Sequence, residues 1–285
     1  MNQTIYRDVD NNAIRFSKIM KMEAETPFTG LGIKYVASGT EIYYANNRKY
    51  TVKEGEYIIG NDFTTTFVQI DHREIVQGLC IDISAHIISE VAEYHDLNGS
   101  ELKEFLLSDQ LLVNTYKVKN TGLGLSLNEI NRKIKSGSFP YNLQQSELFY
   151  NLAESIITDQ RYVFDHFRKM EFKKRETNAE VFRSLLNAKC HIDEHISENI
   201  ALDSLSIQTG ISKYHFIRLF KSTFGISPYQ YQKRRKLEHA RLALIKGVSV
   251  SDVALTYGFA DASAFSKAFR QTFGQSPGSI QKSNF

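Results

Sequence analysis

The chain of 285 residues is 42% hydrophobic and 24% charged, with a formal net charge of +3. This apolar content is enough for two folded cores and excludes a disordered protein. The sequence has no apolar run of about eighteen residues and no basic leader before an apolar segment, so we expect a cytoplasmic protein without a membrane partner. Cys80 and Cys190 have no C-x-x-C partner, which argues against a zinc site or a disulfide framework.

Residues 13–84 form short alternating segments rich in Tyr, Ile, Val, Phe and Thr, separated by Gly, Asn and Asp. Many short strands before any long helix predict an antiparallel β-barrel or jelly roll. The last strand is expected to be half-buried, because five largely apolar residues share one of its faces. They are Ile75, Gln77, Leu79, Ile81 and Ile83. The segment VKEGEYIIGND and the strand after it resemble the corresponding part of a cupin-like barrel.

Helices are predicted after the strands, at residues 84–95, 100–109 and about 123–135, with one or two longer helices at 141–167. A broad apolar stripe runs along this last segment and predicts a buried face. It consists of Leu148, Phe149, Leu152, Ala153, Ile156 and Ile157. The fold class is therefore predicted to be α+β.

Four polar aromatic residues on the predicted strands are candidate ligand-binding residues, because barrel mouths and interiors are common ligand sites. They are Tyr35, Tyr43, Tyr57 and His72. Each of them fits a place in the core or at the rim as well. The sequence does not name a ligand.

A cupin metal site needs several His and a carboxylate, usually beginning with two His one residue apart. His72 and His86 are fourteen residues apart, so we predict no metal. No Walker, dinucleotide or G-x-S-x-G pattern occurs either. We therefore predict no cofactor, no catalytic residue and no enzyme.

The charge is divided unevenly. Residues 171–285 contain 17 Lys and Arg against 10 Asp and Glu, a net +7, whereas residues 1–170 contain 18 against 22, a net −4. The basic half is therefore expected to contact the phosphates of a nucleic acid. Polar residues 169–177 are the predicted linker between domains at 1–168 and 178–285.

One pattern occurs twice in the basic half. Residues 202–210 return as 250–258 at a shift of 48, and residues 216–228 return as 265–277 at a shift of 49. Each copy reads as a short helix, a turn with glycine and a longer helix, which predicts two helix-turn-helix units. Gly225 and Gly274 are expected to end the longer helices, and Pro228 and Pro277 to begin the next elements.

The longer helices are predicted to have one buried and one outward face. The buried face carries Phe216, Leu219 and Phe220 in the first copy and Phe265, Ala268 and Phe269 in the second. The expected base-reading residues are Tyr214, His215, Ile217, Arg218, Ala262, Ser263, Ser266 and Lys267. The expected phosphate contacts are Lys213, Lys221, Lys233, Arg234, Arg235, Lys236 and Arg270. A helical hairpin that only packs would explain the apolar stripes, but not two outward faces that both end in cations.

Residues 177–281 resemble the DNA-binding domain of the AraC/XylS transcription regulators. The resemblance rests on GISKYHFIRLFKSTFGISP, YQYQKRRKLEHARLAL and SVSDVALTYGFADASAFSKAFRQTFGQSP. The chain departs from the usual pattern at a few positions. Ser206 stands in place of Ala and Lys236 in place of Arg, and Ile217, Ala262 and Ala264 leave the recognition helices with fewer polar base-reading groups. The resemblance implies double-stranded DNA as the partner, an activator that contacts RNA polymerase, and an N-terminal cupin-like sensor with a small-molecule effector.

The resemblance also implies a homodimer, because the helices after the barrel commonly build the dimer interface in this family. Leu148, Leu152 and Ile156 are then candidate interface residues. The alternative is that the apolar stripe only covers the barrel.

The segment that links the two repeats predicts how they are spaced. A helix of some 18 residues from about 228 to 246 would span about 27 Å. It could place the recognition helices about one turn of DNA, near 34 Å, apart, so that one protomer reads two successive major grooves. Two other classes stay open, which are a non-specific architectural DNA-binding protein and a ligand-binding or catalytic barrel.

Overall fold

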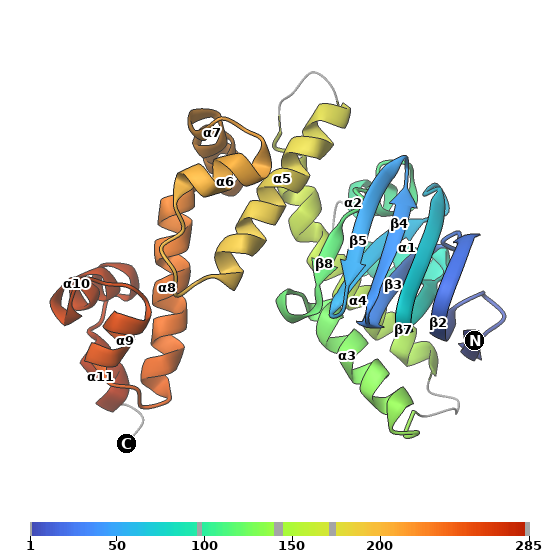
Figure 1. Ribbon diagram of the computed structural model, residues 1–285, viewed down its shortest axis with the longest axis horizontal. Coiled ribbons are helices and arrows are strands. Elements are labelled where there is room, and N and C mark those ends of the chain that lie inside the picture. The colour runs from blue at the N-terminus through green and yellow to red at the C-terminus, as the bar shows by residue number, and fades with distance from the viewer. Residues whose placement is uncertain (1, 96–98, 140–144, 171–174, 283–285) are drawn as a thin grey trace. The chain divides into compact units, whose positions relative to one another are not determined.

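The computed structural model describes residues 2–95, 99–139, 145–170 and 175–282. The chain forms two compact units, Met1–Asp165 and His166–Phe285. The first unit contains the sheet and the second is helical (Figure 1). This confirms the predicted α+β fold, in which an antiparallel sheet and its helices precede two helix-turn-helix units.

The elements of the first unit follow the predicted order. They are β1 (Asn2–Arg7), β2 (Ala13–Glu25), β3 (Leu31–Ser38), β4 (Thr40–Ala45), β5 (Arg48–Lys53), β6 (Glu56–Asn61), β7 (Thr66–Ile83), α1 (Ala85–His95), α2 (Gly99–Leu107), β8 (Thr115–Lys117), the 3-10 helix η1 (Val118–Asn120), α3 (Gly122–Lys135) and α4 (Gln145–Phe167). Residues 141–144 of the predicted long helix lie outside the described residues. The rest of that segment is the single helix α4.

The sheet curls because β7 changes partners along its length. Its strand order is β1-β2-β7-β3-β6-β8, and β4 pairs with β5 and with the first part of β7. The second part of β7 pairs with β3 instead. Side chains from β3, β4, β5, β6 and β7 consequently meet in one apolar core, as expected for the predicted barrel or jelly roll.

Two glycines inside strands make room for an aromatic ring in this core. Gly32 of β3 and Gly60 of β6 are opposite each other in register. A Cβ at Gly60 would lie 2.3 Å from the ring of Phe28, and a Cβ at Gly32 would lie 2.5 Å from it. These glycines therefore serve close packing within the sheet rather than a turn.

The other face of the sheet is covered by α3 and α4 (Figure 1). The Tyr35 hydroxyl donates a hydrogen bond to Asn128 Oδ1 at 2.9 Å, and the Tyr57 hydroxyl donates to Thr121 Oγ1 at 2.9 Å. Asp159 of α4 accepts hydrogen bonds from two backbone N–H groups at the start of α3, at 3.1 and 2.9 Å. These contacts hold α3 against the sheet and against α4.

The prediction of a half-buried last strand was wrong. Ile75 is 50% exposed, whereas Val76 and Asp82 are buried on the face opposite to Leu79 and Ile81. Both faces of β7 are covered from Val76 onward, because the helices lie on one side and the curled sheet encloses the other. Alternation alone shows one covered face and cannot show the second.

The apolar stripe of α4 is part of the core of the first unit. Leu152 is 1% exposed and Ile156 is fully buried, while Leu148 is half-buried. The ring of Phe149 lies 5.7 Å from that of Tyr6 in β1. Leu152 and Ile156 therefore cover the sheet within one chain, and this corrects their prediction as dimer contacts.

The second unit contains seven helices among the residues described. They are α5 (Arg175–Glu194), α6 (Leu202–Thr209), α7 (Lys213–Phe224), α8 (Pro228–Ile245), α9 (Val250–Thr256), α10 (Ala262–Phe273) and α11 (Pro277–Lys282). Much of the predicted linker, residues 171–174, lies outside the described residues.

Each helix-turn-helix unit has its own core. Phe216, Leu219 and Phe220 of α7 pack with Leu205 of α6 and with side chains of α5. In the same way, α10 contributes Phe265, Ala268 and Phe269 to a core that also contains α8, α9 and α11. The six predicted inward residues are all buried. Gly225 and Gly274 end α7 and α10 with φ of 81° and 72°, and Pro228 and Pro277 begin α8 and α11, as predicted.

Helix α8 is tied to the first helix-turn-helix unit by polar contacts. The Tyr231 hydroxyl donates to Asp193 at 2.8 Å, and Lys236 Nζ donates to Asn199 Oδ1 at 2.6 Å. Lys236 is only 5% exposed, and burial lowers the pKa of its ammonium group. A Cβ at Gly258, in the turn of the second helix-turn-helix unit, would lie 3.4 Å from Lys236 Nζ. Lys236 thus lies where both helix-turn-helix units approach α8.

The burial of Leu152 predicts that Leu152→Glu destabilises the first unit instead of separating a dimer. The change removes a buried apolar side chain and places a carboxylate among apolar neighbours, which should cost at least about 3 kcal/mol. Chemical denaturation of the full chain measures this cost. The matched control is Leu125→Glu on α3, where the side chain is 66% exposed. If Leu152→Glu gave a stable, folded monomer, the stripe would be a dimer interface and not part of the core.

The position of Lys236 predicts that Lys236→Ala lowers the free energy of unfolding of the second unit by about 1–3 kcal/mol, because it leaves Asn199 Oδ1 without its donor. Lys233→Ala, one turn earlier and half-buried, should change it by less than about 0.5 kcal/mol. Urea denaturation followed by circular dichroism compares the two. Equal effects would show that the Lys236 contact adds nothing to stability.

Candidate nucleic-acid interface

The two recognition helices are placed by turns that differ in chemistry. In the first helix-turn-helix unit the Ser206 hydroxyl donates to the Ile211 carbonyl at 2.6 Å and closes the turn before α7. In the second helix-turn-helix unit Asp261 caps α10 by accepting from the Ala264 N–H at 2.6 Å. Ser212 makes no such side-chain cap for α7. The hydroxyl of Ser206, which the usual Ala lacks, therefore has a structural partner.

The outward face of α7 has the predicted composition. Tyr214 is 82% exposed, and His215, Arg218 and Lys221 are exposed as well. Ile217 is half-buried at the border of this face. The helix therefore presents an aromatic ring, an imidazole and two cations on a surface that fits a major groove in width.

The outward face of α10 carries shorter side chains at several positions. Its side chains line a hollow of about 480 Å³, made by Ser263, Ser266, Lys267, Arg270 and Gln271. Ala262 is half-buried beside it. Gln271 was not predicted, although it lies four residues after Lys267 and so continues the same helical face. Its amide is a group that pairs with adenine edges in a major groove.

Two of the four consecutive cations on α8 point into the protein. Arg235 Nε donates to Asp193 Oδ1 at 2.7 Å and Nη1 donates to Glu238 at 2.5 Å, and Lys236 is buried against Asn199. Successive helical residues are turned by about 100°, so four in a row cannot share one face. The prediction that Arg235 and Lys236 contact phosphate is corrected accordingly.

The other predicted phosphate contacts lie on the surface. Lys221 and Arg270 are exposed, and Lys233 is half-buried. Lys213 pairs with Asp203 at 2.9 Å, and Arg234 pairs with Glu238 at 3.0 Å. Exposed pairs of this kind are weak, so a phosphate can replace the carboxylate at little cost.

The predicted ligand-binding residues do not form one site. Tyr35 and Tyr57 are buried toward the helices, whereas Tyr43 is buried in the core within the curled sheet. The Tyr43 hydroxyl donates to Glu41. His72 is exposed on β7. The three tyrosines serve the packing of the first unit.

A buried charged cluster near Tyr43 was not predicted. Lys34, Glu41 and Asp82 are all buried, and Arg15 donates to Asp82. Lys34 Nζ lies 4.7 Å from the centre of the Phe28 ring. Burial lowers the pKa of Lys34 and raises the pKa of both Glu41 and Asp82. Strand alternation places these charges on an inward face, but their mutual pairing follows only from the curl of the sheet.

Two further observations concern the residues that the structure describes. No three His, Cys, Asp or Glu side chains among them are grouped as metal ligands would be. No helix within the same residues combines the length and the apolar composition needed to cross a bilayer.

The comparisons with known proteins centre on the helical unit. Residues 205–283 match a family model described as a helix-turn-helix domain. The chain is 27% identical over 255 residues to the uncharacterized HTH-type transcriptional regulator YbfI of Bacillus subtilis, which covers 88% of this chain and 84% of that protein. It is 34% identical over 87 residues to the probable transcription factor PqrA of Proteus vulgaris, covering 30% of this chain and 71% of that protein.

Among solved structures, ToxT from Vibrio cholerae aligns over 94% of this chain and 97% of its own, with a TM-score of 0.38 and 14% identity. The duplicated helix-turn-helix units and the sequence relatives lead to one assignment. The chain belongs to the AraC/XylS family of transcriptional regulators.

Proposed function

We propose that the second unit binds specific sequences of double-stranded DNA with α7 in one major groove and α10 in the next. The observation that carries this proposal is the repetition of an exposed, partly cationic face on two recognition helices that share α8. The 18 residues of α8 span about 27 Å. This length suits two grooves about 34 Å apart on one side of the duplex.

Base reading is assigned mainly to α7. Arg218 can donate two hydrogen bonds to a guanine edge, and Ile217 can contact a thymine methyl group. Tyr214 and His215 lie on the same exposed surface. In α10 the residues Ala262, Ser263 and Ser266 have shorter side chains that reach fewer base atoms, so Gln271 and Lys267 are its longest candidate readers.

Affinity is assigned to phosphate contacts by Lys213, Lys221, Lys233, Arg234 and Arg270. These contacts supply binding energy without sequence information and weaken as salt rises. Arg235 and Lys236 are left out because their hydrogen-bonding groups are engaged within the unit. The smaller set of surface cations favours a site-specific regulator over a non-specific architectural protein, which depends on phosphate contacts for nearly all its affinity.

The first unit is proposed as the sensor half of the regulator, covering residues 1–168, and residues 169–177 as the linker to the DNA-binding half at 178–285. We propose that the protein is an activator that contacts RNA polymerase, responds to a small-molecule effector and works as a cytoplasmic homodimer. The division of the chain into two compact units, one with the sheet and one helical, supports a sensor and an output in one chain. The dimer surface must lie outside Leu152 and Ile156, which are buried within each chain.

Selection from a random duplex library tests the proposed reading. We expect a consensus with two conserved segments about one helical turn apart. Arg218→Ala should relax the preference at one or two base pairs, by about 1–3 kcal/mol for a lost bidentate contact. Arg270→Ala, which removes a proposed phosphate contact of α10, should weaken binding to all sites alike. No enrichment from the library would favour the architectural alternative. A change of preference in Arg270→Ala but not in Arg218→Ala would reverse the division between α7 and α10.

A further inference from the structure

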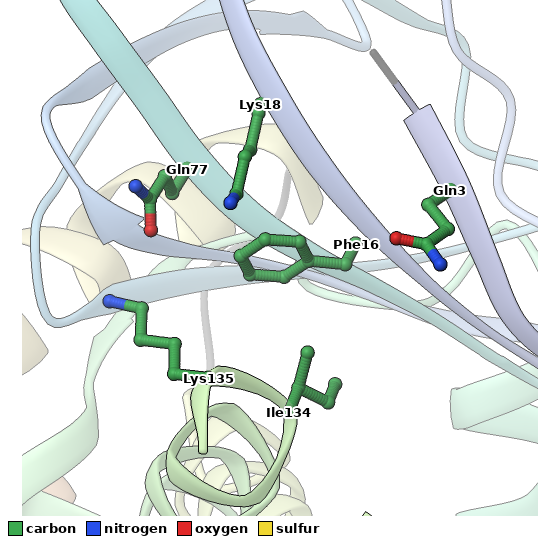
Figure 2. Close-up of a pocket in the computed structure, with 6 residues that line it drawn as sticks. All are labelled: Gln3, Phe16, Lys18, Gln77, Ile134 and Lys135. Atoms are coloured by element: carbon green, nitrogen blue, oxygen red, sulfur yellow. The ribbon is translucent and has the colours of Figure 1, made fainter. Parts of the chain in front are cut away.

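A cavity of about 520 Å³ lies on the helix-covered face of the sheet, where α3 ends. Figure 2 shows the side chains that line it, which are Gln3, Phe16, Lys18, Gln77, Ile134 and Lys135. The Phe16 ring lies at the centre of this group, and the ammonium groups of Lys18 and Lys135 are directed toward the space around it (Figure 2). None of the described residues that line the cavity is acidic.

Rigid elements place these groups. Phe16 and Lys18 are two residues apart on β2 and so project from the same face of the sheet. In register, Lys18 is opposite Gln77 of β7, and Phe16 is opposite Gln3 of β1. The fourth wall is the last turn of α3, which supplies Ile134 and Lys135. Three paired strands and one helix therefore fix the cavity without a loop.

The lining combines an apolar floor with positive charge. Phe16 is only 6% exposed, and Lys18 Nζ lies 5.5 Å from the centre of its ring. Two ammonium groups can donate charge-assisted hydrogen bonds to one anion, and the amides of Gln3 and Gln77 can donate further ones. A flat apolar group can stack on the phenyl ring at the same time.

We propose that this cavity binds a small organic anion, in which a carboxylate or phosphate group is attached to a flat ring. Lys18 and Lys135 hold the anionic group, while Phe16 and Ile134 contact the ring. The volume lies within the range of about 300–1,000 Å³ that small-molecule sites have. The site lies within the first unit and its existence does not depend on DNA binding. Its use as an effector site rests on the function proposed above.

The test uses the full chain and measures the binding of 1-naphthoate, benzoate and phenyl phosphate by titration calorimetry. 1-Naphthalenemethanol serves as the neutral counterpart of 1-naphthoate. We expect at least one anion to bind and the neutral alcohol to bind at least about tenfold more weakly than 1-naphthoate, because it lacks the charge-assisted contacts. The relative affinities of benzoate and phenyl phosphate distinguish a carboxylate site from a phosphate site.

The double variant Lys18→Gln with Lys135→Gln should lose at least about tenfold in affinity for the bound anion. The matched control is Lys49→Gln with Lys53→Gln, which removes two exposed lysines of β5 from the same unit. This control should bind as the unchanged protein does. Equal affinity in both double variants, or no binding of any of the three anions at millimolar concentration, would overturn the proposal.

DNA binding without any added anion separates this proposal from the proposed function. Both double variants should bind a selected DNA site as the unchanged chain does, because their substitutions lie in the first unit. A chain that binds the anion but no DNA would contradict the function and leave the anion site standing. The reverse result would remove the site alone.

Discussion

The packing of α8 against both helix-turn-helix units is the constraint on which the geometry of the second unit depends. Its early residues bond to the end of α5 and to the loop that follows, through Tyr231 and Lys236. Its later residues belong to the core of the second helix-turn-helix unit. They are Leu237, Ala240 and Leu244. One continuous helix therefore carries both recognition helices. A helix has a fixed rise, so their separation is set by packing and does not depend on a flexible connection.

In both compact units the buried charged side chains have polar partners within the protein. In the second unit Arg235 and Lys236 are engaged with Asp193 and Asn199, which stabilises α8 but removes two cations from the surface. In the first unit Lys34 and Asp82 are buried within the curled sheet and have polar partners of their own. That core is filled by the protein's own side chains. The cavity lined by Lys18 and Lys135 lies instead on the helix-covered face, where the lysines can meet a ligand from solvent.

Much of the second unit could be predicted because its signals are local. Phe216 and Phe220 lie one helical turn apart, Gly225 permits the left-handed cap, and the whole pattern recurs 48 to 49 residues later. Such features determine helices and turns within a dozen residues. The outward faces of α7 and α10 follow directly from these buried ones.

The remaining features depend on partners that are distant in the sequence. The Tyr35 hydroxyl bonds to Asn128, 93 residues later, and no pattern around Tyr35 indicates that contact. The stripe that contains Leu152 is the same whether it covers a sheet or another chain, so periodicity cannot separate core from interface. The cavity needs Phe16, Gln77 and Lys135 together, and these meet only through the strand order and the end of α3.

Hydroxyl-radical footprinting of the full chain on a selected DNA site tests the central claim most directly. Two recognition helices held by one α8 should protect two patches of backbone on the same side of the duplex, with centres about 10.5 base pairs apart. Replacing Lys267 and Arg270 of α10 with Ala should weaken the protection of one patch only. A single protected patch in the unchanged protein, or two patches on opposite sides of the duplex, would contradict the reading of successive grooves by one rigid unit.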